Sequence, residues 1–282
     1  MKKLLIVDCG NLAYRSVHVS VNQDSDDNYS FFLWRHLFLN SFLQTIIKFS
    51  PDRVILAIDS PENWRKELYK GYKLDRAAKR AKSNVNFDRF FPIMNTFLED
   101  LQKTFTNIFF MKVDKTEADD IVATVCLRSE DTRSIIVSSD SDFHQLLSNN
   151  INQFNPFDRL LVESINPKRE LQVKILTGDK SDCVPAVRPK VGPKTALKLI
   201  DGGLQDLLDS DEEVKKNYER NEQLIDLTKI PDIYSNEIWK KYMEYDVKEI
   251  RHGSIYNFLT KNKLQRIIDE WNSYDELIKK LK

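Results

Sequence analysis

The chain has 282 residues, of which 41% are hydrophobic, and its 43 lysines and arginines equal its 43 aspartates and glutamates. This composition fits a globular protein with one large domain or two unequal ones. Because the net charge is zero, the protein surface cannot be uniformly positive, although basic residues can still cluster in one region. Three scattered cysteines without a CxxC motif argue against zinc and fit a reducing cytoplasm. No apolar run reaches the ~18 residues of a membrane span.

Three apolar runs in the first half of the chain each end in an aspartate. They are residues 4–8 with Asp8, residues 54–59 with Asp59 and residues 135–140 with Asp140. Continuous apolar runs predict strands that are buried on both faces of a mostly parallel sheet. Helical spacing over residues 32–48 and 117–128 predicts flanking helices, so the fold class is α/β. Ligands bind outside the carboxyl ends of such strands, and the three aspartates are therefore expected at one edge.

The segment Thr116-Glu117-Ala118-Asp119-Asp120 places three acids within four residues at a predicted helix start. Thr116 is a good N-cap, Asp119 stands at the capping-box position, and acids favour the positive end of a helix dipole. Glu117 and Asp120 share a helix face. Capping accounts for one or two of these acids and does not require all three.

Two further acidic segments follow. Asp140 and Asp142 lie in a Ser-rich stretch after the third strand, and Asp179 and Asp182 follow Gly178, a predicted helix C-cap. An ordinary polar loop, or the start of another helix, would explain either segment alone. Four aspartates at one sheet edge repel one another unless cations neutralise them. Oxygen donors without His or Cys favour Mg²⁺ or Mn²⁺, and two such ions support phosphodiester hydrolysis.

Residues 64–82 hold eight basic residues against two acids. On a helix, Lys66, Lys70 and Lys73 would share one face. A solvated surface helix is one explanation, but in a neutral chain this asymmetry favours an element that faces phosphates. The aromatic residues between the lysines either stack on bases or pack in the interior: Trp64, Tyr69 and Tyr72.

After about residue 165 the strand patterns give way to helical ones. We therefore expect an α/β region over residues 1–165 and a helical region over residues 166–282. Within the second region, Gly192-Pro193-Lys194-Thr195 is a turn that opens a helix. Free backbone N–H groups at such a helix start can bind a phosphate, with charge added by Lys194.

In this order, the motifs resemble the flap-endonuclease/5′-exonuclease superfamily, and most of all its T-even-type bacteriophage members. They are Val-Asp-Cys-Gly-Asn at 7–11, Ala-Ile-Asp at 57–59, Tyr-Lys-Gly at 69–71, Glu-Ala-Asp-Asp at 117–120, Ser-Ser-Asp-Ser-Asp-Phe at 138–143 and Gly-Asp-Lys-Ser-Asp at 178–182. The resemblance covers nearly the whole chain. It implies a twisted sheet, a helical arch over about 64–92 and a DNA-binding helical region with a helix–hairpin–helix-type motif over about 176–200.

The resemblance also implies an activity and its residues. The activity is structure-dependent 5′→3′ nuclease action by a two-metal mechanism, which removes RNA primers and adjoining DNA from lagging-strand fragments and cuts 5′ flaps. The acids match two metal groups: first Asp8, Asp59, Glu117, Asp119, Asp120 and Asp140, and second Asp142, Asp179 and Asp182. We expect the catalytic residues to be Asp120, Lys70 and Lys73, of which the two lysines reach the scissile phosphate. The expected DNA contacts are Arg65, Lys66, Lys70, Lys73, Arg76, Gly192, Lys194 and Thr195.

The resemblance further suggests cofactors and partners. Mg²⁺ is expected, with Mn²⁺ as a substitute. A K⁺ ion held by the hairpin is doubtful, because Cys183 and Ala186 replace the usual Asn and Gly. Expected substrates are branched or flapped DNA and RNA–DNA duplex, and expected partners are a single-stranded-DNA-binding protein and a sliding clamp. We expect a monomer in the cytoplasm, or in the host cytoplasm for a phage chain.

Three other readings compete with this one. A non-catalytic binder of branched DNA would show gaps in the acid set. A PIN-type ribonuclease would be shorter and would lack the basic insertion. A phosphotransferase would need a Walker-type glycine loop, which the sequence lacks.

Overall fold

The computed structural model describes residues 1–21, 26–248 and 252–281. Within them, six strands form one sheet in the order β3-β2-β1-β4-β5-β6. The strands are β1 Lys2–Asp8, β2 Arg53–Ala57, β3 Phe109–Met111, β4 Thr132–Val137, β5 Ile151–Asn155 and β6 Leu160–Val162. Every neighbouring pair is parallel except β5 with β6. The predicted mostly parallel sheet is confirmed.

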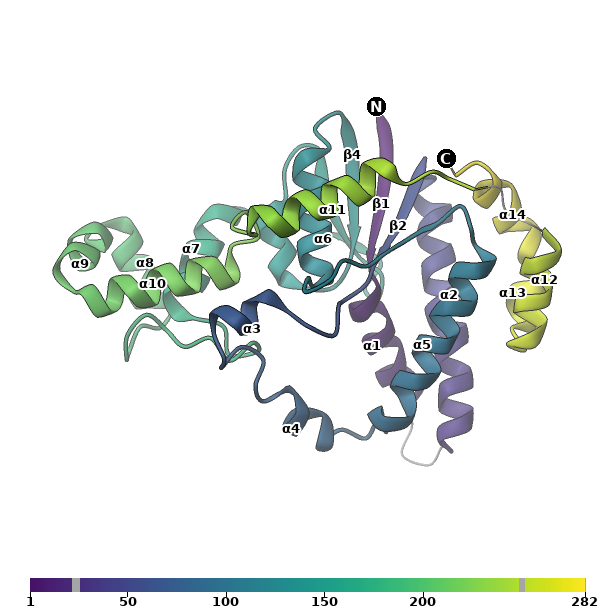
Figure 1. Ribbon diagram of the computed structural model, residues 1–282, viewed down its shortest axis with the longest axis horizontal. Helices are drawn as coiled ribbons and strands as arrows, with labels where there is room; N and C mark the ends of the chain where they lie inside the picture. Colours follow the sequence, from purple (N-terminus) through teal and green to yellow (C-terminus); the bar gives the residue numbers. More distant parts are fainter. Residues whose placement is uncertain (22–25, 249–251, 282) are drawn as a thin grey trace.

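Helices cover both faces of this sheet (Figure 1). Those within the first 146 residues are α1 Cys9–Ser20, α2 Asp27–Phe49, α3 Trp64–Leu68, α4 Arg76–Ala81, α5 Phe87–Thr104, α6 Ala118–Arg128 and the 3₁₀ helix η1 Ser141–Leu146. Because successive strand residues point to opposite faces, Leu5 and Val7 pack with α1, α2 and α5. Leu4 and Ile6 pack with α6 on the other face. The helices predicted over 32–48 and 117–128 are confirmed as α2 and α6.

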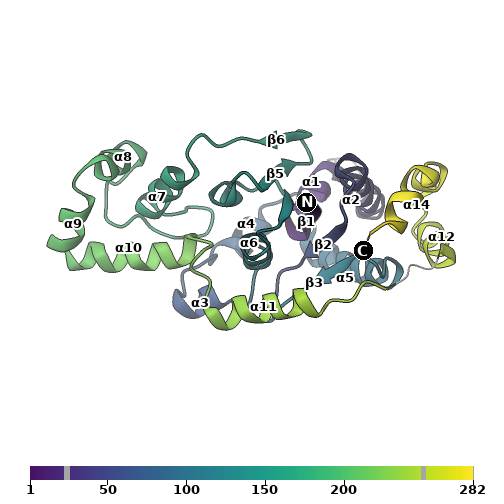
Figure 2. The same ribbon diagram turned by 90° about the horizontal axis from the view of Figure 1, so that it is seen from above.

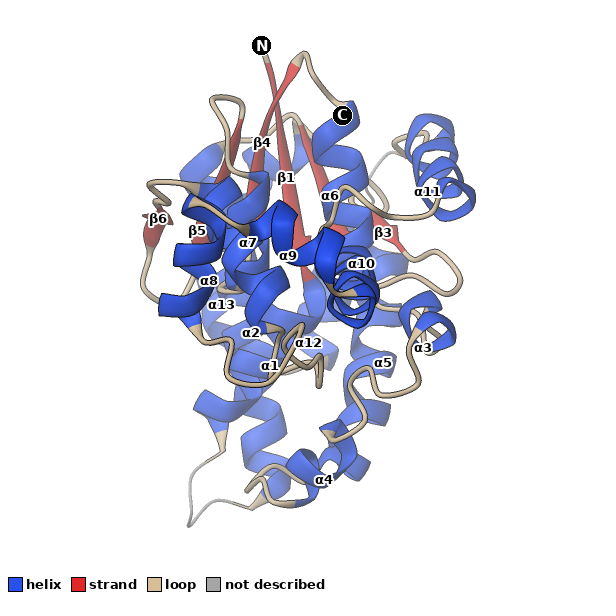
Figure 3. Ribbon diagram, turned by 90° about the vertical axis from the view of Figure 1, so that its left-hand side faces the viewer, coloured by secondary structure: helices blue, strands red, loops and turns tan. Residues whose placement is uncertain are grey.

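The basic segment folds as two short helices, α3 and α4, joined by turns (Figure 3). The prediction that Lys66, Lys70 and Lys73 share one helix face is wrong. The helix α3 ends at Leu68, and Lys73 has a positive φ of 55°. Gly71 lies against the Tyr69 ring, where a Cβ would come within 2.6 Å of ring carbon. The chain therefore turns at this point instead of continuing as a helix.

The helices of residues 166–281 pack in three places. They are α7 Pro167–Thr177, α8 Pro193–Asp201, α9 Leu204–Ser210, α10 Glu212–Ile225, α11 Asp232–Glu244, α12 His252–Lys261, α13 Gln265–Asp269 and α14 Trp271–Lys279. Helices α7 to α10 form a side lobe, residues 167–225, with its own apolar cluster (Figure 2). Helix α11 packs on α6, whereas α12 to α14 join α2 and α5. The described helices between residues 167 and 279 thus do not share one core.

Two local predictions in this region are confirmed. Gly178 ends α7 with a φ of 70°, and a Cβ there would lie 2.3 Å from the Val184 carbonyl oxygen, so glycine is required. Gly192 caps α8, with Pro193 in its first turn.

Among the residues that the structure describes, no helix is both long enough and apolar enough to cross a membrane.

Candidate active site

Carboxylates from several strands meet at the carboxyl edge of the sheet. Asp8 ends β1 and accepts hydrogen bonds from the Asn11 backbone N–H at 3.0 Å and the Ser138 hydroxyl at 3.1 Å. Asp59 follows β2 and accepts from the Ala118 N–H at 2.7 Å. These bonds fix the Asp8 carboxylate through both of its oxygens and the Asp59 carboxylate through Oδ1. The predicted meeting of strand-end aspartates is confirmed for this pair.

Gly10 keeps the space between these two carboxylates open. A Cβ at this position would lie 3.2 Å from Asp59 Oδ2 and 3.6 Å from Asp8 Oδ1. An alanine at this position would therefore crowd Asp59 Oδ2, while its contact with Asp8 Oδ1 would be an ordinary one.

The strand-end group carries unbalanced negative charge. Burial, followed by the charges of Asp59 and Asp140, raises the pKa of Asp8 to about 7. Burial and the charge of Asp8 likewise raise the pKa of Asp119 well above its ordinary value. A carboxyl group whose pKa is raised by its neighbours is one that a bound cation would relieve. Asp8, Asp59, Asp119 and Asp140 together are called the strand-end group below.

A second group lies between η1 and the loop after α7. Asp142, Asp179 and Asp182 each offer an oxygen, and these oxygens lie within 4.8 Å of one another. The loop is held by a two-residue bridge in which Asp179 and Val184 exchange backbone hydrogen bonds at 2.9 and 2.8 Å. The explanation that Asp179 and Asp182 start a helix is wrong, because the next helix begins only at Pro193. These three acids are called the loop group.

One acid of the strand-end group, Asp119, lines a pocket together with all three acids of the loop group. Tyr72 also lines this pocket. The donors are carboxylate oxygens on rigid elements, which suits a hard divalent cation such as Mg²⁺ or Mn²⁺.

Glu117 anchors the base of the arch. Its carboxylate accepts from Lys73 Nζ at 2.5 Å, Arg65 Nη1 at 3.2 Å and the Tyr72 hydroxyl at 2.9 Å. Burial opposes ionisation of Glu117, but Lys73 and Arg65 outweigh it and lower its pKa to about 2. Glu117 is therefore ionised and already balanced by protein cations.

Lys73 and Tyr72 also reach the loop group. Lys73 Nζ lies 3.4 Å from Asp182 Oδ2, its backbone N–H donates to the Asp182 carbonyl at 2.8 Å, and the Tyr72 hydroxyl lies 3.0 Å from Asp182 Oδ2. Arg76 Nη2 approaches the same carboxylate at 3.4 Å. The base of the arch thus touches both Glu117 and the loop group.

The structure corrects the predicted role of Asp120. This side chain is fully buried, 2.8 Å from Arg65 Nη2, and it accepts from Trp64 Nε1 at 3.1 Å and the Glu117 N–H at 2.9 Å. Both hydrogen bonds go to Oδ2, and Oδ1 is the oxygen that lies beside the Arg65 guanidinium inside the protein. Asp120 is therefore a structural acid, and its assignment as a metal ligand and catalytic residue is wrong.

Two related predictions, for the cap of α6 and for Arg65, are also wrong. The N-cap of α6 is Glu117 and the capping-box acid is Asp120, not Thr116 and Asp119. Arg65 is only 1% exposed. Its guanidinium binds Glu117 and Asp120, so the prediction that it contacts nucleic acid is wrong. Trp64 and Tyr72 are buried as well, which selects the packing explanation for these two aromatic residues.

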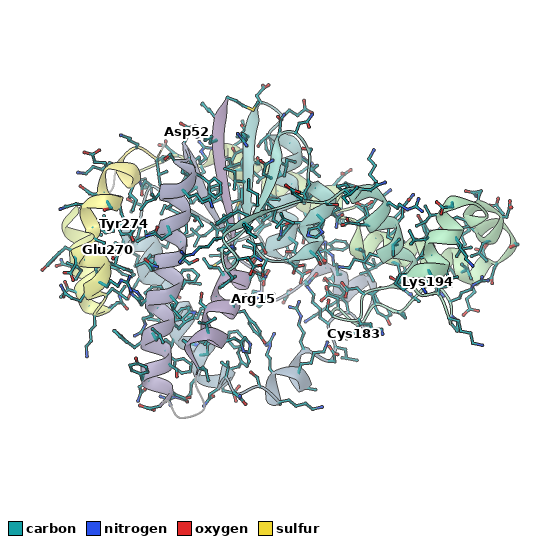
Figure 4. All side chains as sticks on the ribbon, turned by 180° about the vertical axis from the view of Figure 1, so that it is seen from behind. Arg15, Asp52, Cys183, Lys194, Glu270 and Tyr274 are labelled. Carbon is teal, nitrogen blue, oxygen red and sulfur yellow. The ribbon has the colours of Figure 1, made fainter. Side chains whose placement is uncertain are left out.

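Lys73, another predicted contact, is only 8% exposed, whereas the remaining predicted contacts are accessible. Lys66 is exposed on α3, Lys70 is exposed just after it, and Arg76 is exposed at the start of α4. Lys194 is exposed on the side lobe, and Cys183 lies on the part of the loop nearer the sheet (Figure 4). The contacts of these lysines and of Arg76 with nucleic acid stay predictions.

Sequence reasoning missed one functional candidate, Lys174. It lies in the last turn of α7, and its Nζ contacts Asp142 Oδ1 and lies 2.7 Å from Asp179 Oδ2. The only signal in the sequence was its position, four residues before Gly178 and so one helical turn from the acidic loop.

Comparisons with known proteins show which family the chain belongs to. The family model for the 5′-3′ exonuclease, N-terminal resolvase-like domain, matches residues 3–169. Ribonuclease H of Enterobacteria phage T4 is 26% identical over 297 residues, covering 96% of this chain and 95% of that protein. The 5′-3′ exonuclease of Buchnera aphidicola is 31% identical over 213 residues, covering 71% and 70%.

A solved structure shares the fold. The flap endonuclease of bacteriophage T5, solved with DNA and metal ions, is 20% identical, covers 86% of this chain and 98% of that one, and gives a TM-score of 0.66. The expected fold is confirmed by this match. With the family model covering more than half of the sequence, the chain belongs to the 5′-3′ exonuclease family of nucleases.

Proposed function

We propose that this chain is a structure-dependent 5′→3′ nuclease that uses two Mg²⁺ ions, for which Mn²⁺ can substitute. It removes RNA primers and adjoining DNA from lagging-strand fragments and cuts 5′ flaps. The observation that carries the proposal is the pocket where Asp119 of the strand-end group meets the three acids of the loop group, beside an arch whose base is fixed by Lys73.

The strand-end group would hold one divalent ion and the loop group the other. Bound there, the ions supply a water nucleophile at neutral pH and stabilise charge on the attacking and leaving oxygens. Lys73 and Arg76, at the base of the arch, face the loop group and are positioned to balance the charge of a scissile phosphate. Lys70, exposed on the adjoining turn, adds a further positive charge.

Duplex DNA would bind along the side lobe. The start of α8 presents Gly192, Lys194 and Thr195, and its free N–H groups suit a phosphate. The T5 flap endonuclease of similar fold was solved with DNA, which supports branched or flapped DNA as the substrate. RNA–DNA duplex is proposed from the likeness to the T4 ribonuclease H. A monomeric cytoplasmic enzyme that works with a single-stranded-DNA-binding protein and a sliding clamp completes the proposal.

A series of 5′-labelled flap substrates, with RNA or DNA 5′ ends, tests the function. Incubation with and without Mg²⁺ should give short 5′ products only with the metal, and product lengths distinguish exonuclease from flap cleavage. Asp119→Asn should abolish these products, whereas Asp114→Asn, a matched change at an exposed aspartate five residues away, should not. Absence of any metal-dependent product from the unmodified chain would refute the proposal and favour a non-catalytic DNA binder.

A further inference from the structure

Lys174 places a positive charge inside the loop group. It projects from α7, with its side chain 27% exposed, and its Nζ lies 2.7 Å from Asp179 Oδ2 and in contact with Asp142 Oδ1. These are two of the three carboxylates whose oxygens gather within 4.8 Å. The ammonium group therefore occupies a place where a cation bound by these oxygens would also lie.

The charges of the pair support a lasting contact. Burial disfavours the ammonium form of Lys174, but Asp142 and Asp179 outweigh burial and raise its pKa above the ordinary value. Burial of Asp179 is likewise outweighed by Lys174, and the pKa of Asp179 is lowered. The two ion pairs that Lys174 forms, with Asp142 and with Asp179, partly neutralise the loop group without any metal.

The strand-end group differs in this respect. Asp8 accepts hydrogen bonds from two uncharged donors, the Asn11 N–H at 3.0 Å and the Ser138 hydroxyl at 3.1 Å. Within the described residues, no lysine or arginine lies at ion-pair distance from any carboxylate of this group. Lys73 lies near enough to act on Asp59 and Asp119, but a divalent ion entering that group meets no ammonium in direct contact with its carboxylates, whereas one entering the loop group meets Lys174.

We propose that Lys174 is a built-in counter-ion of the loop group, a positioning residue that orders its carboxylates and weakens divalent binding there relative to the strand-end group. This inference rests on the proposed two-metal function. A +2 ion about 4 Å from an ammonium group is repelled enough, even at the dielectric constant of water, to lose roughly 10- to 30-fold in affinity. The second ion would then bind well only when further negative charge, such as a substrate phosphate, enters the pocket.

Titration of the full-length chain with Mn²⁺, followed by electron paramagnetic resonance and calorimetry without nucleic acid, tests this inference. The unmodified chain should show one stronger and one weaker class of site. Lys174→Met should strengthen the weaker class by about 10-fold or more, and Lys174→Arg, which keeps the charge, should resemble the unmodified chain. Lys174→Gln provides a second neutral variant, and circular dichroism checks that each variant is folded.

Lys180→Met is the matched control, because Lys180 is an exposed lysine between Asp179 and Asp182 in the same loop. Its effect should stay within roughly 3-fold, since solvent and salt screen an exposed charge. An unchanged weaker class in Lys174→Met, or an equal effect of Lys180→Met, would overturn the inference while leaving the two-metal proposal intact. An unmodified chain that binds no Mn²⁺ would overturn both.

Discussion

Asp8→Asn should stabilise the metal-free protein at pH 8. The ionised Asp8 carboxylate is buried near two other carboxylates, which together with burial raise its pKa from 3.8 to about 7. Asparagine keeps an oxygen to accept from the Asn11 N–H and removes the charge. The substitution therefore relieves repulsion without removing the cap of α1.

The pKa shift sets the size of the effect. A shift of about 3 units at 1.36 kcal/mol per unit gives ~4 kcal/mol by which folding disfavours the ionised group. For an acid with a raised pKa, folding stability falls as pH rises from about 4 to about 7, and the full penalty is present above 7. At ~2.1 cal/mol/K for each residue, ~4 kcal/mol corresponds to a rise in Tm of roughly 7 °C. At pH 5 only about a third of this gain should remain.

Differential scanning calorimetry in EDTA at pH 8 and pH 5 measures both quantities. Asp52→Asn is the control: Asp52 is an exposed aspartate at the opposite sheet edge that also accepts from a backbone N–H, that of Lys3 at 2.8 Å (Figure 4). Its effect should stay within about 0.5 kcal/mol. A lower Tm for Asp8→Asn at pH 8, or an equal gain at both pH values, would show that Asp8 is not held under electrostatic strain.

Three other predictions concern the acids, the buried arginine and the side lobe. Asp119→Asn should abolish Mg²⁺-dependent flap cleavage while Tm is kept or raised, and normal single-turnover cleavage by this variant would contradict the prediction. Asp120→Asn should instead lower stability by ~3–5 kcal/mol, because it removes one of the two carboxylates that pair with the buried Arg65. Arg65→Met should lower the free energy of unfolding, measured in urea, by ~3–5 kcal/mol. Arg89→Met, at an arginine in an exposed ion pair, should lower it by under ~1 kcal/mol. Equal losses would contradict a structural role for Arg65. Fluorescence anisotropy should show that the affinity for flap DNA falls as the salt concentration rises. Lys194→Ala should reduce the slope of log affinity against log salt concentration by about 1. An unchanged slope would show that α8 does not contact the DNA.

The sheet and its acidic edge could be predicted because both depend on local patterns. Apolar runs ending in Asp8 and Asp59 specify strands buried on both faces, and parallel strands bring their carboxyl ends to one edge. The end of α7 at Gly178 was likewise predictable, since only glycine fits its φ of 70° beside the Val184 carbonyl.

The partners of each charge could not be predicted, because long-range folding decides them. Arg65 belongs to a basic run and resembles a DNA contact, yet the Trp64 N–H bonds to the Lys115 carbonyl at 2.9 Å and carries α3 to the start of α6. There Arg65 meets Asp120, a residue 55 positions away in the chain. The packing of the last helices could not be predicted for the same reason. Phe258 packs in the apolar cluster with α2 and α5, but helical spacing in the sequence does not indicate which other helix an apolar face contacts.

The distribution of these counter-ions indicates which acids need a metal. Glu117 is balanced by Lys73 and Arg65, so its pKa falls to about 2, whereas Asp8 lies among other acids and its pKa rises to about 7. Folding therefore stabilises one carboxylate and destabilises the other, although both belong to the same acidic set. A divalent ion gains most where the protein supplies no cation. The first ion should accordingly bind at the strand-end group, and its uptake below pH 7 should release protons, which calorimetry in buffers of different ionisation enthalpy would detect.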